Sequence, residues 1–170
     1  MDHFARLGLP AALDLEPASL DWAYFALQRQ WHPDRFANRP ADERARASTE
    51  AAALNDAYRT LKDPLSRAVY LAELKGVALP GDGKTIDDPD LLMEAMEARE
   101  ALHEAATVGV IDKLAAEARD EVKRALGSLD SLFLRDDKPA IRKTLLRLRY
   151  LDKFADEART RRANLERSSA

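Results

Sequence analysis

Apolar residues in this chain recur at the spacing of an α-helix and do not alternate as they would along a strand. The clearest run is Leu20, Tyr24, Leu27 and Trp31, at successive steps of 4, 3 and 4 residues. Such steps place side chains on one face of a helix. Pro33 lacks a backbone N–H and disfavours the α conformation in the residue before it, so this helix must end there. The sequence therefore predicts an all-α fold.

Seven helices are predicted from this periodicity, with prolines and glycines between them. The expected ranges are 2–7, 19–31, 41–61, 64–75, 89–106, 110–132 and 137–166. Asp63 and Asp88 each precede a proline, the order of an N-cap residue and a first helical position. Residues 76–88 are rich in glycine and aspartate and are expected to form a linker. It would join a four-helix unit, residues 1–75, to a three-helix bundle, residues 89–170.

Composition excludes several classes of function. The 170 residues contain no cysteine, which excludes disulfides, thiolate catalysis and a cluster held by the chain's own thiolates. The net charge of −3 gives no general attraction to nucleic acid or to an anionic membrane. The N-terminus lacks the pattern of a signal peptide, and no apolar run approaches the roughly 20 residues that span a bilayer. The cytoplasm is the expected location, and no cofactor is expected.

A His-Pro-Asp tripeptide, His32 to Asp34, lies between two of the expected helices. Catalysis would need His32 as a base, Asp34 to orient it, and a nucleophile with an oxyanion site nearby. The stretch has no serine, cysteine or glycine-rich turn, and the three histidines are too far apart to suggest a metal site. A plain turn is one alternative. A proline-stiffened loop also loses little conformational entropy on docking, which favours a contact with a partner protein.

Residues 1–75 resemble the J-domain of DnaJ-type co-chaperones. The resemblance rests on WHPDRF, on LNDAYRTLKDPLSRAVYL (residues 54–71) and on the order of the helices. It implies contact with an HscA/DnaK-type ATPase chaperone, stimulation of its ATP hydrolysis, and a second helix that lies along that ATPase. The contact residues it implies are His32, Pro33, Asp34, Arg29 and Arg35. Many J-domains carry several Lys or Arg on that helix. Here Arg29 is the main one, so weak electrostatic steering is expected.

A second informative stretch, LLMEAMEAREALHE, occupies residues 91–104. At about 100° per residue, its small and apolar residues gather within about 40° of Leu91. These residues are Ala95, Ala98, Leu102 and Ala105. The opposite side, at about 100° to 240°, mixes large apolar side chains with glutamates. Methionine adapts to irregular surfaces, and glutamates favour a basic one, so this side is interpreted as a binding patch. Alternatively, other parts of the chain cover it.

The same stretch, with KTLLRLRYLDKF (residues 143–154), resembles the C-terminal domain of HscB-type co-chaperones. Together with the J-domain, the resemblance covers essentially the whole chain. It implies binding of an IscU-type scaffold protein, on which iron–sulfur clusters are assembled. The scaffold-binding residues it implies are Leu92, Met93, Met96, Glu97, Glu100, Glu104 and Tyr150. The helical pattern places Tyr150 opposite Leu145 and Leu148, and either a surface or a core position remains open for it.

The expected function is that of a non-enzymatic co-chaperone. It would deliver an IscU-type scaffold to an HscA/DnaK-type ATPase and activate that ATPase, and any cluster would belong to the partner. A general J-protein with another client is a second hypothesis. A third is a histidine phosphotransfer bundle that uses His103. Its neighbours are neutral or acidic, whereas phosphotransfer needs a cation nearby.

Overall fold

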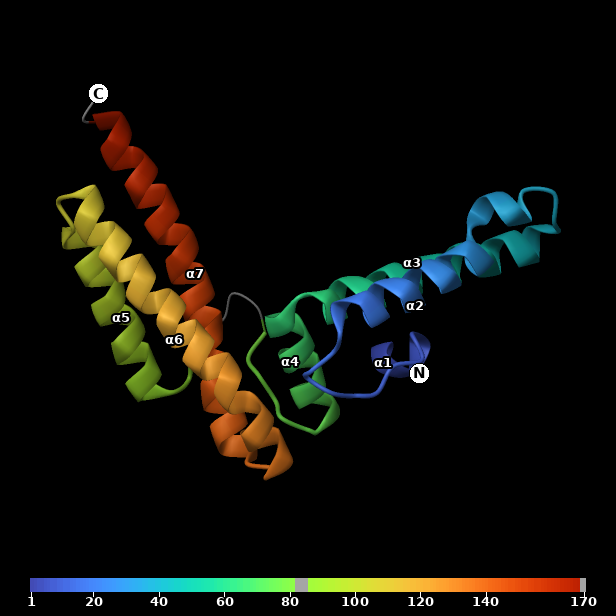
Figure 1. Ribbon diagram of the computed structural model, residues 1–170, viewed down its shortest axis with the longest axis horizontal. Helices are drawn as coiled ribbons and strands as arrows, with labels where there is room; N and C mark the ends of the chain where they lie inside the picture. The colour runs from blue at the N-terminus through green and yellow to red at the C-terminus, as the bar shows by residue number, and fades with distance from the viewer. Residues whose placement is uncertain (82–85, 169–170) are drawn as a thin grey trace. The chain divides into compact units, whose positions relative to one another are not determined.

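The computed structural model describes residues 1–81 and 86–168, and within them every regular element is helical (Figure 1). The all-α prediction is confirmed. The elements are α1 (His3–Arg6), α2 (Pro17–Trp31), the 3-10 helix η1 (Pro33–Phe36), α3 (Ala41–Lys62), α4 (Pro64–Leu74), α5 (Pro89–Glu104), α6 (Val108–Leu134) and α7 (Lys138–Ser168). In the described ranges, none of these helices has the length and apolar character needed to cross a membrane. The chain divides into two compact units, Met1–Leu74 and Lys75–Ala170.

Side-chain caps set where several helices begin. The Asp63 carboxylate accepts a hydrogen bond from the Ser66 backbone N–H at 2.7 Å, and Asp88 accepts one from Leu91 at 3.0 Å. Both predicted N-caps are confirmed. The start of α6 was predicted two residues too late, because the Thr107 hydroxyl caps the helix and takes Gly109 into its first turn. A capping side chain satisfies one of the N–H groups that a helix terminus leaves without a partner.

In the first unit, α2 and α3 lie side by side as a helical hairpin, with α1 and α4 packed on α3 (Figure 1). Alanines on α3 let α2 approach closely, and the buried α3 residues are Ala47, Ala51, Leu54, Ala57 and Leu61. The predicted inner stripe of α2 is only partly right. Leu20 is buried, whereas Tyr24, Leu27 and Trp31 are half-buried. Among the described residues, the helix paired with α2 is α3, so its outer side meets no second layer of helices.

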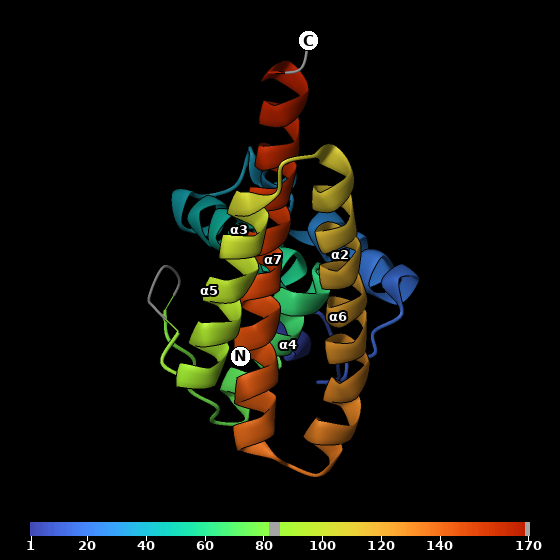
Figure 2. The same ribbon diagram turned by 90° about the vertical axis from the view of Figure 1, so that its left-hand side faces the viewer.

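In the second unit, α5 and α6 both pack on α7, which lies between them (Figure 2). The α7 residues that form the core are Ile141, Leu145, Leu146, Leu148, Leu151, Phe154 and Ala158. On α5 the buried residues are Leu91, Ala95 and Leu102, and Ala105 is buried just beyond its end. The predicted inward face of this helix is confirmed at these positions.

The segment that was expected to be a linker is fastened to α7 in its described part. Val77 is buried, the Arg142 guanidinium donates to the Ala78 carbonyl at 3.0 Å, and Arg149 donates to the Pro80 carbonyl at 2.6 Å. Residues 82–85 of the expected linker lie outside the described residues. The glycines and aspartates of this segment predict an irregular backbone. They do not predict that arginines on a distant helix donate hydrogen bonds to the segment's backbone carbonyls.

Replacing Leu145 by Ala should lower the free energy of unfolding by about 2 to 5 kcal/mol, since it leaves a cavity among packed helices. Leu145 has an exposed fraction of 0%. Urea unfolding followed by circular dichroism would measure the change. Leu134→Ala, at an exposed position on α6, is the matched control and should change stability by less than about 0.5 kcal/mol. Equal effects at the two positions would contradict this description of the core.

Candidate functional site

The His-Pro-Asp tripeptide forms a corner between α2 and a short 3-10 helix. His32 is extended, with φ −60° and ψ 128°, and it both ends α2 and caps η1. The Arg35 backbone N–H donates to the His32 carbonyl at 3.0 Å, which closes the turn. A stiffened loop was predicted here, but η1 was not, because short 3-10 turns have no periodic sequence pattern. We call residues 32–34 the His-Pro-Asp corner.

Both functional groups of the corner are offered to solvent. The Asp34 side chain is 90% exposed, and its carboxylate lies 3.6 Å from His32 Nδ1, too far for a hydrogen bond. Nδ1 accepts instead from the Asp34 backbone N–H at 3.3 Å. The neutral ring therefore carries its proton on Nε2. Asp34 thus does not orient the imidazole as a catalytic dyad would, and the arrangement suits contact with another molecule.

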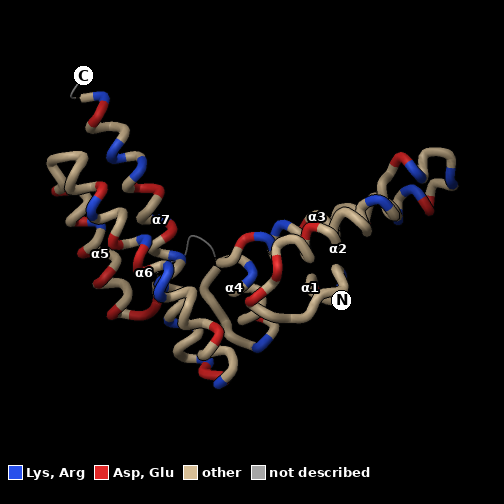
Figure 3. The backbone as a smooth tube through the Cα atoms, viewed as in Figure 1, with Lys and Arg blue, Asp and Glu red and all other residues tan. Residues whose placement is uncertain are grey.

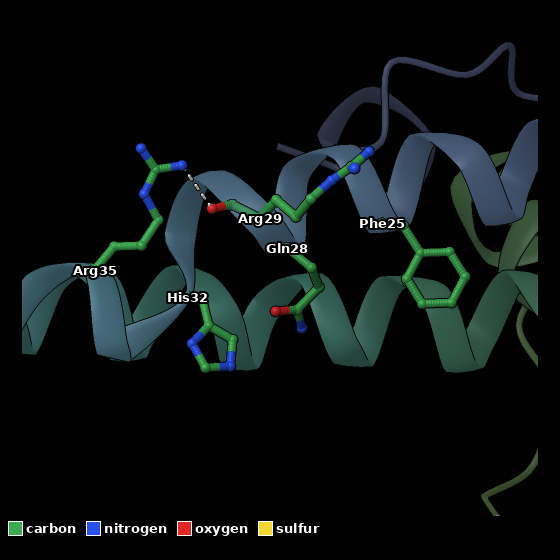
Figure 4. A pocket seen from close by; sticks show the side chains of 5 residues that line it. All are labelled: Phe25, Gln28, Arg29, His32 and Arg35. Atoms are coloured by element: carbon green, nitrogen blue, oxygen red, sulfur yellow. Dashed lines mark hydrogen bonds between the residues drawn. The ribbon is translucent and has the colours of Figure 1, made fainter.

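Contacts on both sides hold the corner in place. The rings of Trp31 and Phe36 stack with centroids 6.0 Å apart and an interplanar angle of 4°. The Arg46 guanidinium on α3 lies 5.8 Å from the centroid of the Trp31 ring, in cation–π geometry. Arg35 donates to the Arg29 carbonyl at 3.0 Å (Figure 4). The two arginines predicted to flank the tripeptide are therefore joined to each other across the bend.

An open hollow runs from the end of α2 to η1. It is lined by Phe25, Gln28, Arg29, His32 and Arg35. The side chains of Phe25, Gln28 and His32 leave α2 on the same side (Figure 4). Hydrogen bonds fix the Gln28 side chain, because its amide donates to the Tyr24 hydroxyl and to the side-chain oxygen of Asn55 on α3. Phe25 and Gln28 were missed from the sequence, although Phe25, Arg29 and His32 share the helical steps of 4 and 3 that would have indicated one face.

Large apolar groups stand exposed on the outer face of α5. Met93 is 63% exposed and Met96 is 62% exposed, and Leu92 beside them is half-buried. The surrounding glutamates Glu97, Glu100 and Glu104 are all exposed. Acidic residues recur along this helix, and Arg99 is its single basic residue apart from His103 (Figure 3). We call these two methionines and three glutamates the methionine patch.

Ion pairs with α7 hold α5 along its flanks and leave the methionine patch free. Arg147 makes a bidentate contact with Glu94, and Arg99 makes one with Glu157, each with a closest distance of 2.8 Å. Arg161 donates to three carbonyls at the end of α5, those of residues 102, 103 and 105. The burial of the Arg147 guanidinium is outweighed by its bonds to Glu94, so the pKa of Arg147 is raised. Pairs this exposed add little stability, but they orient the helix.

Tyr150 lies at the border between core and surface. Its side chain is half-buried and packs against the core cluster that α5, α6 and α7 form together. Burial, followed by the negative charge of Glu94, raises the pKa of the Tyr150 hydroxyl. The choice left open between a core and a surface position therefore resolves to an intermediate one. Among the described residues, no group of three or more His, Asp or Glu could hold a metal ion.

Comparisons with known proteins agree on one family. Residues 87–159 match the family model described as the HSCB C-terminal oligomerisation domain. The chain is 39% identical to the co-chaperone protein HscB homolog of Burkholderia multivorans, over 96% of this chain and 95% of that protein. It is 40% identical to the protein of that name from Cupriavidus taiwanensis, over 90% of this chain and 89% of that protein.

Solved structures agree with these sequence relatives. Chaperone HscB from Vibrio cholerae is 31% identical with a TM-score of 0.82, and the match covers 97% of this chain and 99% of that one. The human co-chaperone protein HscB is 29% identical with a TM-score of 0.85, covering 94% of this chain and 81% of that one.

Proposed function

The chain belongs to the HscB family of co-chaperones, and from this premise we propose that it serves iron–sulfur cluster assembly by bringing a scaffold protein to an ATPase chaperone. It binds an IscU-type scaffold, delivers it to an HscA/DnaK-type ATPase and stimulates ATP hydrolysis there. It performs no covalent chemistry itself. The observation that carries the proposal is the pair of exposed features on different compact units, the His-Pro-Asp corner on the first and the methionine patch on the second.

The two units divide the work. Residues 1–75 act as the J-domain, and residues 89–170 act as the scaffold-binding domain. Each feature lies on helices of its own unit, α2 with η1 in one case and α5 in the other. A protein that holds both partners raises their effective concentration relative to each other, which increases the apparent affinity without a new contact between them.

At the His-Pro-Asp corner, the exposed Asp34 carboxylate accepts hydrogen bonds from donors on the ATPase. Pro33 fixes the backbone angle that presents it, and the stacked Trp31 and Phe36 rings keep the turn from opening. Arg29 and Arg35 stand beside it as donors to acidic or carbonyl groups of the partner. Because the backbone of the corner is already fixed, docking costs little backbone conformational entropy.

At the methionine patch, Met93 and Met96 enter apolar depressions of the scaffold, because their flexible thioether side chains adapt to an irregular surface. Leu92 and Tyr150, both half-buried, extend this contact at its edge. Glu97, Glu100 and Glu104 surround it and pair with basic groups of the scaffold. Charged groups at the rim of an interface contribute mainly to encounter rate and to the choice of partner.

Reconstitution tests the proposal as a whole. Single-turnover ATP hydrolysis by an HscA-type ATPase should be faster when this chain is added. It should be faster again when an IscU-type scaffold is added with it, since the scaffold then arrives already bound. An ATPase rate that this chain leaves unchanged, with or without the scaffold, would contradict the proposal.

Salt should weaken scaffold binding, because the glutamates act through screened charge. Between about 0.1 M and about 1 M salt the Debye length falls from about 10 Å to about 3 Å, and the affinity should fall several-fold. Isothermal titration calorimetry with an IscU-type scaffold would measure it. A control variant, Glu97→Gln with Glu100→Gln and Glu104→Gln, should lose most of this salt dependence. Unchanged or tighter binding of the original chain at high salt would argue against a role for the glutamates.

A further inference from the structure

The middle of α5, where the methionine patch lies, packs on α7 through small side chains (Figure 2). The buried residues of α5 are Leu91, Ala95 and Leu102. Over the roughly three turns between the two leucines, the fully buried position is therefore an alanine. Helices fix their mutual orientation when large side chains of one insert between those of the other. A methyl group inserts too little for this, so apolar packing only weakly specifies the rotation of α5 about its own axis.

Two ion pairs between α5 and α7 lie on opposite sides of this line of contact. Glu94 on α5 binds Arg147 on α7. Arg99 on α5 binds Glu157 on α7, so the second pair has the reverse polarity. At about 100° per residue, Glu94 stands about 60° to one side of Leu91 and Arg99 about 80° to the other side. We call them the flanking pairs. A turn of α5 in either direction would therefore break one of them.

The geometry of the flanking pairs suits a restraint on rotation. Arg147 Nε and Nη2 lie 3.2 and 2.8 Å from the two oxygens of Glu94. Arg99 Nε and Nη2 lie 3.1 and 2.8 Å from those of Glu157. A planar guanidinium that makes two parallel hydrogen bonds fixes the angle of its partner, which the point charge of a lysine would not do. The most buried of the four side chains, Arg147, is still 28% exposed, so the pairs contribute more to orientation than to stability.

We propose that the flanking pairs are positioning contacts of the scaffold site, which fix the rotation of α5 so that the methionine patch faces the scaffold as one surface. This inference rests on the proposed function, and none of the four side chains needs to touch the scaffold. Met93 and Met96 lie within about 40° of the point opposite Leu91, so a turned α5 would carry one of them toward the bundle. A chain that has the competent orientation for only part of the time binds its partner more weakly by that fraction.

The test neutralises both pairs from the α7 side, with Arg147→Met combined with Glu157→Gln. This variant keeps the net charge of α7 and every residue of α5. If the competent orientation is then populated for about a tenth to a fifth of the time, calorimetry with an IscU-type scaffold should show an affinity lower by about fivefold to tenfold. The melting temperature should fall by only a few degrees, because the pairs are exposed. Arg162→Met, which breaks a pair between α7 and Asp112 on α6, is the matched control and should leave the affinity unchanged.

An exchange of charges supplies the rescue. Glu94→Arg and Arg99→Glu on α5, combined with Arg147→Glu and Glu157→Arg on α7, rebuild both pairs with reversed polarity. The net charge of each helix stays the same. The affinity for the scaffold should return close to that of the original chain if the pairs act on the orientation of α5. Charges that bind the scaffold directly would instead be reversed, and the affinity would fall further.

Spin labels follow the orientation of α5 independently of binding. The chain has no cysteine, so labels attach only where one is introduced. Ala101→Cys on α5 and Lys153→Cys on α7 place them at exposed positions. Pulsed electron paramagnetic resonance of the free chain measures the distribution of distances between the two labels. The distribution should broaden in the neutralised variant and become narrow again after the exchange of charges.

The outcomes separate this inference from the proposed function. If the original chain binds the scaffold and the neutralised variant binds equally well, or keeps a narrow distance distribution, the positioning role is wrong while the proposed function stands. If the exchange of charges restores no affinity, or the neutralised variant melts at a much lower temperature, the four side chains contact the scaffold or hold the fold, which also overturns the inference. If the original chain does not bind the scaffold, both the proposed function and the inference fail.

Discussion

Asp34→Asn will abolish stimulation of the ATPase while the fold remains intact. The change keeps the size of the side chain but removes its charge and replaces one acceptor oxygen with an NH₂ donor. Hydrogen bonds to an ionised group are about twice as strong as neutral ones, and a donor on the ATPase left facing the new amide has lost its partner. Loss of a central contact of this kind costs about 2 to 4 kcal/mol, which corresponds to roughly 30-fold to 1000-fold weaker coupling.

The fold should not respond, because the Asp34 side chain is 90% exposed and its carboxylate lies 3.6 Å from His32 Nδ1, too far for a hydrogen bond. Single-turnover ATP hydrolysis with saturating variant would measure the loss, and circular dichroism would show an unchanged melting temperature. The matched control is Asp56→Asn, the same substitution at an exposed position of α3 away from the corner. Normal stimulation of the ATPase by the Asp34→Asn variant would contradict a role of the His-Pro-Asp corner in that stimulation.

Most helices were predictable because their signals are local. Periodic apolar residues predicted α2 to α7, and aspartate before proline predicted the starts of α4 and α5, which the hydrogen bonds of Asp63 and Asp88 confirm. The misses share a different cause. The arginines that fasten residues 78 and 80 to α7 act over more than 60 positions of the chain, and no local pattern encodes such a contact. The half-buried state of Leu27 likewise depends on which helices lie nearby, not on its own spacing.

The same distinction holds for the sites. The corner and the methionine patch are contiguous in sequence, so they were visible as motifs, and the structure shows Met93 and Met96 exposed as the helical angles predicted. Long-range contacts that hold these sites were not visible. Glu94 directly follows the patch methionine Met93, yet it binds Arg147 on α7 and faces away from the patch. The aromatic Phe25 was overlooked because it lies outside the tripeptide motif, although its spacing to Arg29 and His32 indicates a shared helical face.

Because the two sites lie on different compact units, we expect a substitution at one site to leave binding at the other site unchanged. Asp34 belongs to Met1–Leu74 and the methionine patch to Lys75–Ala170, and each is built from side chains of its own unit. A corner variant should therefore retain its affinity for the scaffold, and a patch variant should retain basal stimulation of the ATPase. The additional stimulation of the ATPase that the scaffold produces should require both sites, because it depends on one chain binding the ATPase and the scaffold at the same time.

Met93→Ala combined with Met96→Ala should weaken scaffold binding by about 2 to 4 kcal/mol, as removal of central apolar anchors does. Both side chains are more than half exposed, at 63% and 62%, so their truncation opens no cavity in the bundle. Alanine is also the best helix former, and α5 should keep or slightly gain stability. Calorimetric titration with an IscU-type scaffold measures the affinity, and thermal unfolding checks the fold.

The control for this variant is Leu134→Ala, which removes a comparable exposed apolar side chain from α6 and should leave the affinity unchanged. Leu92 is left intact because it is half-buried, and its truncation would mix lost binding with lost packing. Stimulation of the ATPase by the methionine variant in the absence of scaffold should equal that of the original chain, since the corner is untouched. Unchanged scaffold affinity in a folded Met93→Ala, Met96→Ala variant would show that these methionines meet some other partner, and the delivery role would then lose its structural basis.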